Sequence, residues 1–400
     1  MQQVAAVRTV KQAARILKHM NLQGPEWAGI HEARLGAVRD VLHQRMQERV
    51  GNRLSDLAAL GVRDRRNGSY GRHLLTSMGT LELQVPRTRT FSAVSVIEAY
   101  ARREPWVDRV ILGCFVFGLS TRKVGEALLP ILGERVSAAT VSRVAQVLDE
   151  AVAAFHRRPL TGTYQVLVLD GVVLKRRSGV GALRRPVLVA LGMTPEGKKE
   201  ILDFRLAPGE SQPAWEAFLT DLEERGLKAA GLKLIVTDGG TGLLAALPTV
   251  YPGIPVQRCW AHKGRNVLDK VREADHPKVQ RDLNRISHAE HRTAARRAAR
   301  RFAERWQRVY PAAVRCLLKD LEELLEFFCF SDLQWRKATR TTNAIERQFV
   351  EVRRRTRPMG VFGDRTSIER ILLAVFLHEN RKQGIAAPFP LNPVGRGLQG

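Results

Sequence analysis

The chain has 400 residues, enough for two or three domains with substantial hydrophobic cores. Its 65 lysines and arginines against 40 aspartates and glutamates give a formal net charge of +25, which favours a polyanionic partner such as nucleic acid. Four scattered cysteines argue against a disulfide-stabilised secreted protein, and the absence of an apolar run near ~20 residues argues against a membrane protein, so we expect a soluble intracellular protein.

The N-terminal region is basic and mainly helical in pattern, with one small β element. Apolar residues recur at helical spacing over residues 1–20, where they form one face of an amphipathic helix, and again over residues 26–54. The Asn67-Gly68 pair predicts a turn. Residues 81–86 then alternate apolar and polar side chains, so we expect a short strand that ends at Pro86.

The next segment follows the plan of a helix-turn-helix. One helix starts at Ser120 or Thr121, Gly133 breaks it, and a second helix starts after Ser137, a favourable N-cap. An ordinary hairpin of two helices is the alternative that the local sequence leaves open. Four side chains of the second helix are able to contact DNA: Thr140, Ser142, Arg143 and Gln146.

From residue 164 the pattern changes from helices to strands. The sequence Pro195–Lys198 predicts a hairpin turn, Ser211 caps a later helix, and a further strand ends at Asp238. This order indicates a mixed α/β domain, and residues 265–340 then show a helical pattern without strands. Three apolar runs predict the first strands: residues 164–174, 186–193 and 198–207.

Two aspartates occur in sequences that otherwise have the apolar pattern of buried strands. Asp170-Gly171 lies inside one apolar run and Asp238-Gly239 ends another. Unpaired buried carboxylates are costly, and two such groups side by side repel each other. A divalent cation such as Mg²⁺ removes both problems, so the pair is a candidate metal site. The alternative is that each Asp-Gly pair forms an ordinary turn.

A third acid, Glu346, is the candidate that completes such a site. It lies at the start of a basic helix whose apolar positions include Ile345 and Phe349. The spacing of Asn343 and Glu346 also fits a capping box, a purely structural device at the N-terminus of a helix.

Taken together, these motifs resemble a DDE transposase of the IS256/Mutator-like family of insertion-sequence transposases. The segments "QRCWAHKGRNVL" and "TTNAIERQFVEVRRRTR" are the most specific part of this resemblance. The stretches that carry it span most of the chain: residues 66–89, 118–143, 166–175, 236–268 and 341–362.

The resemblance implies an RNase H-like catalytic domain of mixed α/β class, with Asp170 and Asp238 on adjacent strands and a large all-helical insertion before Glu346. It implies that these three acids are catalytic and bind two Mg²⁺ or Mn²⁺ ions per active site. The expected activity is DNA strand cleavage at the inverted repeats of the element and strand transfer into target DNA. A homodimer or larger homo-oligomer, in the cytoplasm of a bacterial or archaeal cell and associated with the nucleoid, would hold two ends together.

We expect six regions along the chain. A mainly helical DNA-binding region precedes a helix-turn-helix, and the catalytic core is divided by the insertion. The boundaries are residues 1–100 for the basic N-terminal region, 101–158 for the helix-turn-helix, 159–264 for the first part of the core, 265–340 for the insertion, 341–385 for the helical end of the core and 386–400 for a Pro/Gly tail.

Further residues are expected to contact DNA. The resemblance places Cys259 and His262, a Cys-x-x-His signature, beside the active site with Arg265. An alternative for this pair is a structural zinc site with His288 and His291.

Cations and one aromatic residue extend this list. Arg347, Arg353 and Arg354 surround Glu346 and are suited to neutralise phosphates, as is Arg143 in the helix-turn-helix. The alternative for such a run is a solvated basic face. The resemblance implies that Trp306 is an aromatic side chain that stacks on a distorted base. The alternative is that Trp306 is buried in a hydrophobic core.

Two other functions stay open at this point. One is an RNase H-like nuclease or resolvase without strand transfer, and the other is a non-catalytic DNA-binding regulator derived from a transposase. All three acids are present, which argues against the regulator.

Overall fold

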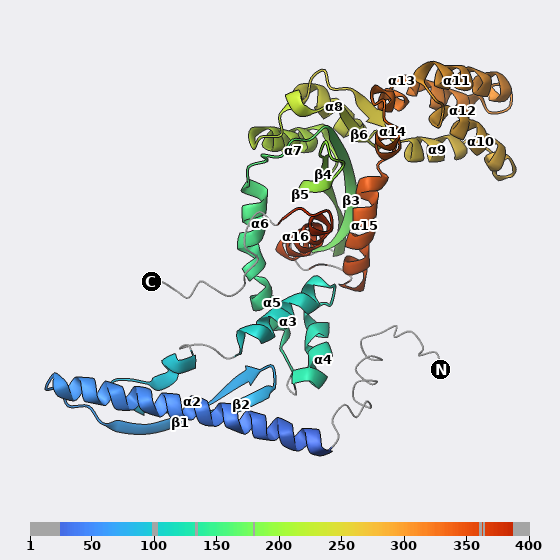
Figure 1. Cartoon of the computed structure of the whole chain (residues 1–400). Coiled ribbons are helices and arrows are strands. Elements are labelled where there is room, and N and C mark those ends of the chain that lie inside the picture. Colours follow the sequence, from blue (N-terminus) through green and yellow to red (C-terminus); the bar gives the residue numbers. More distant parts are fainter. Residues whose placement is uncertain are drawn as a thin grey trace. The chain divides into compact units, whose positions relative to one another are not determined.

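The computed structural model describes residues 25–97, 103–132, 135–178, 181–359, 362 and 365–386 (Figure 1). The predicted helix at residues 1–20 and almost all of the predicted tail lie outside these ranges. The chain divides into two compact units between Val147 and Leu148, and each unit is described by itself. Within the described ranges, no helix is both long and apolar enough to span a membrane.

The first unit begins with a long helix packed on a two-stranded sheet. Helix α2 (Pro25–Ala59) and the short helix η1 (Ala93–Ile97) contact the hairpin of β1 (Arg66–Thr76) and β2 (Gly79–Thr88). Alternate residues of β2 are buried in this core, which confirms the predicted period of two: Leu81, Leu83 and Val85.

Two details of this hairpin differ from the sequence prediction. The Asn67-Gly68 pair does not form a turn between elements but lies within β1, where Gly68 has a φ of +68° and the pairing register shifts between Arg66 and Ser69. A bulge of this kind uses the left-handed conformation that glycine tolerates. Strand β2 also continues past Pro86 to Thr88, because Pro86 pairs with Ser69 at the irregular end of the hairpin.

Three helices complete the first unit: α3 (Pro105–Val116), α4 (Thr121–Leu132) and α5 (Ala138–Ala145), and each contacts the other two. The predicted N-cap is confirmed, since the Ser137 side chain accepts a hydrogen bond from the Thr140 amide. Gly125 permits α4 to approach the chain before α5, because a Cβ at this position would overlap the Val136 carbonyl. Arg143 is exposed on α5, as the sequence predicts.

The second unit is built on a mixed five-stranded sheet in the order β5-β4-β3-β6-β7. Strands β3, β4 and β5 are antiparallel neighbours, and they confirm the predicted meander and its turn, where the Thr194 amide donates to the Lys198 carbonyl. Strands β6 and β7 run parallel to β3. Their bounds are β3 Val166–Ser178, β4 Gly181–Met193, β5 Lys199–Leu206, β6 Leu234–Thr237 and β7 Val256–Arg258.

Helices cover both faces of this sheet (Figure 1). On one face, Leu167 and Leu169 of β3 pack into a core with α7 (Gln212–Glu224) and α8 (Thr241–Val250). Because side chains alternate along a strand, Asp170 points to the opposite face with Val168. Helices α6 (Val147–Arg157), α15 (Asn343–Thr356) and α16 (Arg365–Lys382) lie on that opposite face, where α15 contacts β3 and α16 contacts β5.

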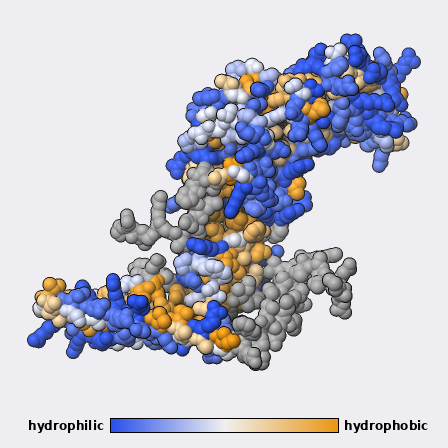
Figure 2. Space-filling view, viewed as in Figure 1, coloured by the Kyte–Doolittle hydropathy of each residue, from blue (hydrophilic) through white to orange (hydrophobic). Residues whose placement is uncertain are grey.

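An insertion of helices separates β7 from α15 and has its own hydrophobic core. It is anchored to the sheet by Gln257, whose buried amide group bonds the Leu324 carbonyl (3.1 Å) and the Phe327 amide (2.7 Å). Its face in Figure 2 is mainly hydrophilic, in keeping with its arginine-rich sequence. Its longer helices are α9 (Trp260–Leu268), α10 (His276–Ser287), α11 (Arg292–Trp306), α12 (Pro311–Lys319) and α14 (Leu333–Thr339), with α13 (Leu321–Leu324) as a single turn.

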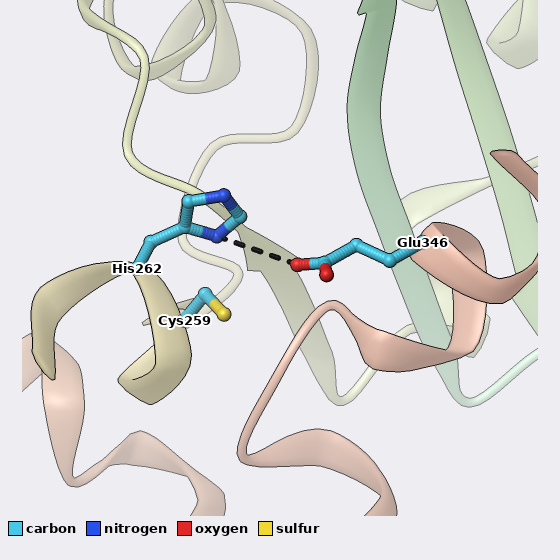
Figure 3. A group of neighbouring side chains, drawn as sticks. All are labelled: Cys259, His262 and Glu346. Atoms are coloured by element: carbon cyan, nitrogen blue, oxygen red, sulfur yellow. Dashed lines mark ion pairs between the residues drawn. The ribbon is translucent and has the colours of Figure 1, made fainter. Parts of the chain in front are cut away.

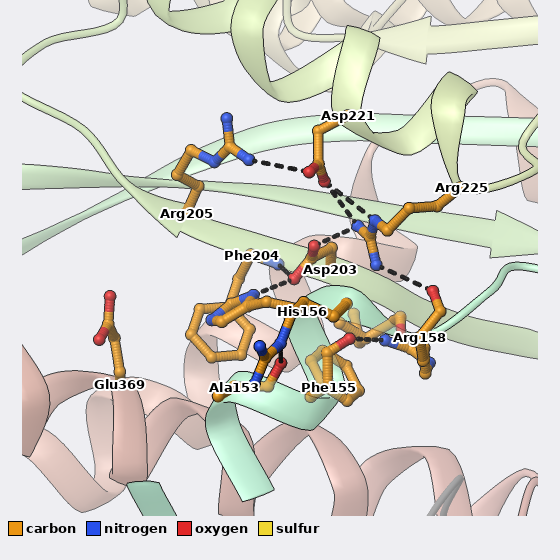
Figure 4. A network of polar contacts seen from close by, with 12 residues as sticks. Ala153, Phe155, His156, Arg158, Asp203, Phe204, Arg205, Asp221, Arg225 and Glu369 are labelled. Atoms are coloured by element: carbon orange, nitrogen blue, oxygen red, sulfur yellow. Dashed lines mark hydrogen bonds and ion pairs between the residues drawn. The ribbon is translucent and has the colours of Figure 1, made fainter. Parts of the chain in front are cut away.

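A buried ionic network joins α6, β5 and α7 (Figure 4). Asp203 is 1% exposed. Its carboxylate lies within hydrogen-bond distance of His156 Nδ1, at 2.6 Å, and also forms an ion pair with Arg225. Arg225 in turn pairs with Asp221 at 2.9 Å. The carboxylate of Asp203 therefore compensates the guanidinium of Arg225, whose side chain is only 10% exposed.

We expect Asp203→Ala to lower the free energy of unfolding by roughly 3 kcal/mol or more, since removing one member of a buried ion pair leaves an uncompensated charge. Urea titration of the variant and the parent measures this difference. Glu224→Ala, an exposed change on α7, is the control and should stay within about 0.5 kcal/mol of the parent. Equal losses for both variants would contradict the role given to Asp203.

Candidate active site

Parallel pairing places the two aspartates beside each other. The register of β3 and β6 aligns Val166 with Leu234 and continues to Leu169 with Thr237. Asp170 is the next residue of β3 and Asp238 is the first residue after β6, so both follow the last aligned pair at the same end of these strands. Strand β3 continues through Asp170 to Ser178, and the alternative of a turn at this position is therefore wrong.

The Asp170 carboxylate is buried, and the charges of the other acids affect its pKa. Its Oδ1 accepts a hydrogen bond from the Gly171 amide at 2.7 Å. Burial first and then the charge of Asp238 raise the pKa of Asp170 to about 7, with a further contribution from Glu346, although the Gly171 bond and His262 oppose the shift. Asp238 and Glu346 thus both lie near enough to Asp170 for their charges to raise its pKa.

Asp238 is held by the tight turn that follows β6. Its Oδ1 accepts from the Gly240 amide at 2.9 Å and from the Thr237 hydroxyl at 3.3 Å. Gly239 has a φ of +93°, and a Cβ there would overlap the guanidinium of Arg258. Glycine is therefore required at this position on conformational and steric grounds, and the second Asp-Gly pair does form a turn.

Glu346 reaches the site from the first turn of α15. The N-cap of this helix is Thr342 rather than Asn343, so the predicted capping box does not form. The helix starts one residue earlier than predicted, because the Thr342 amide and hydroxyl both donate to the Cys259 sulfur at 3.3 Å and fix the chain there. The Thr342 hydroxyl also lies 2.9 Å from Glu346 Oε1.

The Glu346 carboxylate faces Cys259 and His262 (Figure 3). Its Oε1 lies 3.6 Å from His262 Nδ1 and 3.8 Å from Arg265 Nη2. Within the described part of the chain, Cys259, His262 and Glu346 are the one group of three potential metal ligands whose atoms all lie within 4.8 Å of one another. The three acids are therefore neighbours without forming so tight a group, and Glu346 is turned toward the Cys-x-x-His signature.

The two histidines of the zinc alternative serve other purposes. The His291 side chain accepts from the Ala294 amide at 3.1 Å and caps α11. His288 Nδ1 bonds the Ser287 hydroxyl at 3.0 Å and the Asn284 carbonyl at 3.1 Å. Neither belongs to the group around Cys259, so the zinc site with this composition is wrong.

A cationic cavity of about 740 Å³ opens beside α15. Among the described residues that line it there is no carboxylate. Burial and then the charge of Arg347 lower the pKa of Lys199, which indicates positive charges with no compensating anion. Four cations line the cavity: Lys199, Lys337, Arg340 and Arg347.

The other predicted DNA contacts differ in exposure. Arg265 and Arg354 are exposed, and Arg354 pairs with Glu351 at 3.0 Å. Arg353 is half-buried in the last turn of α15. Trp306 is 7% exposed and its Nε1 donates to Asp282 at 3.0 Å. This burial agrees with the core alternative for Trp306, and stacking on a base would require the side chain to leave that core.

The sequence interpretation missed a fourth acid, Glu210. A Cβ at Gly171 would lie 2.6 Å from Glu210 Oε1, so this side chain lies against β3 on the face opposite to Asp170. Burial and then the charge of Asp238 raise the pKa of Glu210. In the sequence, the one notable feature of Glu210 is its position just before Ser211, the N-cap of α7. That position does not predict a functional site.

Comparisons with known proteins agree with one another. Residues 6–384 match the family described as "Transposase, Mutator family". The chain is 32% identical to the transposase for insertion sequence element IS905 of Lactococcus lactis subsp. lactis (strain IL1403), over 87% of this chain and 88% of the relative. It is also 32% identical to the transposase for ISRM5 of Rhizobium meliloti (strain 1021), over 92% of both chains, and to that for IS256 in transposon Tn4001 of Staphylococcus aureus, over 78% and 80%.

The raised pKa of Asp170 predicts an unusual dependence of stability on pH. Between the ordinary value of 3.8 and about 7 the unfolded chain releases a proton that the folded protein retains, so stability falls as the pH rises through this window. In EDTA at pH 8, Asp170→Asn should be more stable than the parent by up to about 4 kcal/mol, and this gain should vanish near pH ~4. Urea titrations at both pH values measure it. Asp269→Asn, an exposed control, should show no such gain, and a gain independent of pH would contradict the assignment.

Proposed function

This chain belongs to the Mutator family of transposases, and we propose that it is an insertion-sequence transposase with a DDE active site at Asp170, Asp238 and Glu346. The observation that carries the proposal is the parallel register of β3 and β6, which sets Asp170 and Asp238 at the same end of these strands. The electrostatic effect of Glu346 on Asp170 supports the third member.

The catalytic core is proposed to be RNase H-like. An antiparallel meander, β5-β4-β3, is followed by two strands parallel to β3, with helices on both faces. This topology and the insertion between β7 and α15 support the fold that the family resemblance implies. In the same way, the exposed Arg143 on the capped helix α5 supports a DNA-binding helix-turn-helix in the first unit.

The donor set fits hard divalent cations such as Mg²⁺ or Mn²⁺, since it consists of carboxylate oxygens, and a cation would offset the burial and the neighbouring negative charge that raise the pKa of Asp170. Asp170 and Asp238 would hold the ions, with Glu346 as the third ligand. A bound pair of such ions supplies an activated oxygen nucleophile and stabilises the leaving oxygen of a phosphodiester. The Gly171 amide donates a hydrogen bond to Oδ1 of Asp170, and the Gly240 amide donates one to Oδ1 of Asp238. These bonds orient the two carboxylates and leave the second oxygen of each for metal binding.

The cationic cavity is proposed to bind the DNA backbone next to this site. Lys199 and Arg347 lie close enough for their charges to oppose each other, and a phosphate would relieve that repulsion. Arg347 follows Glu346 directly in α15, so DNA bound in the cavity would lie near the acids. Transposition requires two element ends to be held together, and we therefore include a dimer or larger assembly in the proposal.

Replacing each acid should separate catalysis from binding. Asp170→Asn, Asp238→Asn and Glu346→Gln should each reduce cleavage of element-end DNA at least roughly 1,000-fold, because a catalytic metal supplies several kcal/mol and each 1.4 kcal/mol is tenfold. Binding of the same DNA should persist. The assay combines protein, Mg²⁺, element-end DNA and a supercoiled plasmid, with Glu224→Gln as the control. Joined products indicate strand transfer, cut ends alone indicate a nuclease, and no Mg²⁺-dependent product in the parent would favour a regulator.

Charge removal in the cavity should weaken DNA binding in a salt-dependent manner. Arg347→Ala is expected to reduce the slope of log affinity against log salt concentration by about one, as for one lost phosphate contact. Fluorescence anisotropy at several salt concentrations measures this slope. Lys228→Ala removes the same charge at an exposed position after α7 and should leave the slope nearly unchanged. Equal changes in both variants would contradict a specific role for the cavity.

A further inference from the structure

We propose that Cys259, His262 and Glu346 form a second metal site, suited to a borderline ion such as Zn²⁺ and separate from the Asp170–Asp238 pair. The site consists of one sulfur, one imidazole nitrogen and one carboxylate oxygen. It differs from the sequence-based zinc alternative, because Glu346 replaces the distant histidines.

The geometry fits tetrahedral coordination. Zinc bonds of about 2.0–2.3 Å to such ligands place neighbouring ligand atoms roughly 3.3 to 3.6 Å apart. His262 Nδ1 and Glu346 Oε1 are 3.6 Å apart, and the Cys259 sulfur lies within 4.8 Å of both. Figure 3 shows the three side chains facing one another, and small side-chain movements would bring all three atoms onto one ion.

The backbone fixes two of the ligands in advance. Cys259 is the N-cap of α9 and His262 lies in its first turn, so both side chains start from one rigid element. Cys259 is fully buried, whereas the His262 ring remains partly exposed. His262 Nδ1 itself is enclosed and has no hydrogen-bond partner among the described residues. An enclosed ring nitrogen that faces a carboxylate and a sulfur without a hydrogen-bond partner is an arrangement that a metal ion would satisfy, with the imidazole as a neutral ligand.

Thr342 supports the other ligands from outside the group. Its amide and hydroxyl approach the Cys259 sulfur at 3.3 Å, and its hydroxyl also contacts Glu346 Oε1. Donors of this kind stabilise the thiolate, which is the form of cysteine that binds metals. Hydrogen bonds from the surroundings also orient metal ligands and tune their affinity.

The mixed ligand set determines which ion is preferred. Thiolate and imidazole ligands select Zn²⁺ and similar ions, whereas Mg²⁺ requires oxygen ligands. Three protein ligands leave a fourth position open to water or to a phosphate oxygen. We therefore infer that the site distinguishes Zn²⁺ from the ions proposed for the acids.

Occupation of this site has a consequence for catalysis that rests on the proposed function. Glu346 is shared, so an ion bound with Cys259 and His262 holds its carboxylate away from Asp170 and Asp238. Zn²⁺ should then inhibit the Mg²⁺-dependent reaction. Metal binding itself does not depend on that function.

Co²⁺ binding to the full-length reduced protein tests the site, because a cobalt–thiolate bond gives a charge-transfer absorption band. The parent should bind one Co²⁺ with this band, and Zn²⁺ should abolish it by displacement. Cys259→Ser should eliminate the band, and His262→Asn should weaken Co²⁺ binding at least about tenfold, since even indirect partners of a metal ligand contribute 10–100-fold. Cys329→Ser removes an exposed thiol elsewhere and should retain the band.

A parent without the band, or a band that persists in Cys259→Ser, would overturn the proposal. Asp170→Asn separates it from the proposed function, because this variant should lose cleavage and keep Co²⁺ binding. If the parent shows no band and Asp170→Asn abolishes cleavage, the second metal site is rejected and the proposed catalytic role stands. If the parent shows the band and Asp170→Asn cleaves normally, the proposed catalytic role is rejected and the second metal site stands.

Discussion

The placement of two carboxylates at the same end of neighbouring parallel strands, one of them buried, is the constraint on which the site depends. The hydrogen-bonded register of β3 and β6 fixes Asp170 and Asp238 at this end, and the packed cores on both sides of the sheet prevent the strands from separating. The cost is visible in the pKa of Asp170, which burial and Asp238 raise to about 7. This cost of burying one carboxylate beside another is the physical basis of the metal site proposed for the acids.

The third acid depends on a different set of contacts. Glu346 is distant in sequence from Asp238, and the helices between them would separate the two if they were not anchored. Gln257 and Arg258, at the end of β7, bond the insertion at Leu324 and Asp320. Cys259 then contacts Thr342 at the start of α15. The insertion thus returns the chain to the sheet, and α15 begins beside the Cys-x-x-His signature.

This route explains why Glu346 lies between two possible partners. On one side is Asp170, whose pKa Glu346 raises, and on the other are Cys259 and His262. The proposed second metal site would share this carboxylate with the proposed catalytic site, so the identity of the bound ion would affect activity. Arg347, the next residue, lines the cationic cavity, so the proposed DNA-binding surface and Glu346 involve the same turn of α15.

The sequence by itself determined the family, the strands and the paired aspartates, because acids that interrupt apolar strands have few explanations and the Cys-x-x-His and Glu346 segments are specific. It also determined local caps such as Ser137, which depend on neighbouring residues alone. Tertiary structure decided the rest. Thr342 replaced Asn343 as the N-cap because of a contact with Cys259, Glu210 came to lie against Gly171, and Lys199 met Arg347 across the cavity. These contacts join residues far apart in the chain, and local periodicity carries no information about which distant side chains become neighbours.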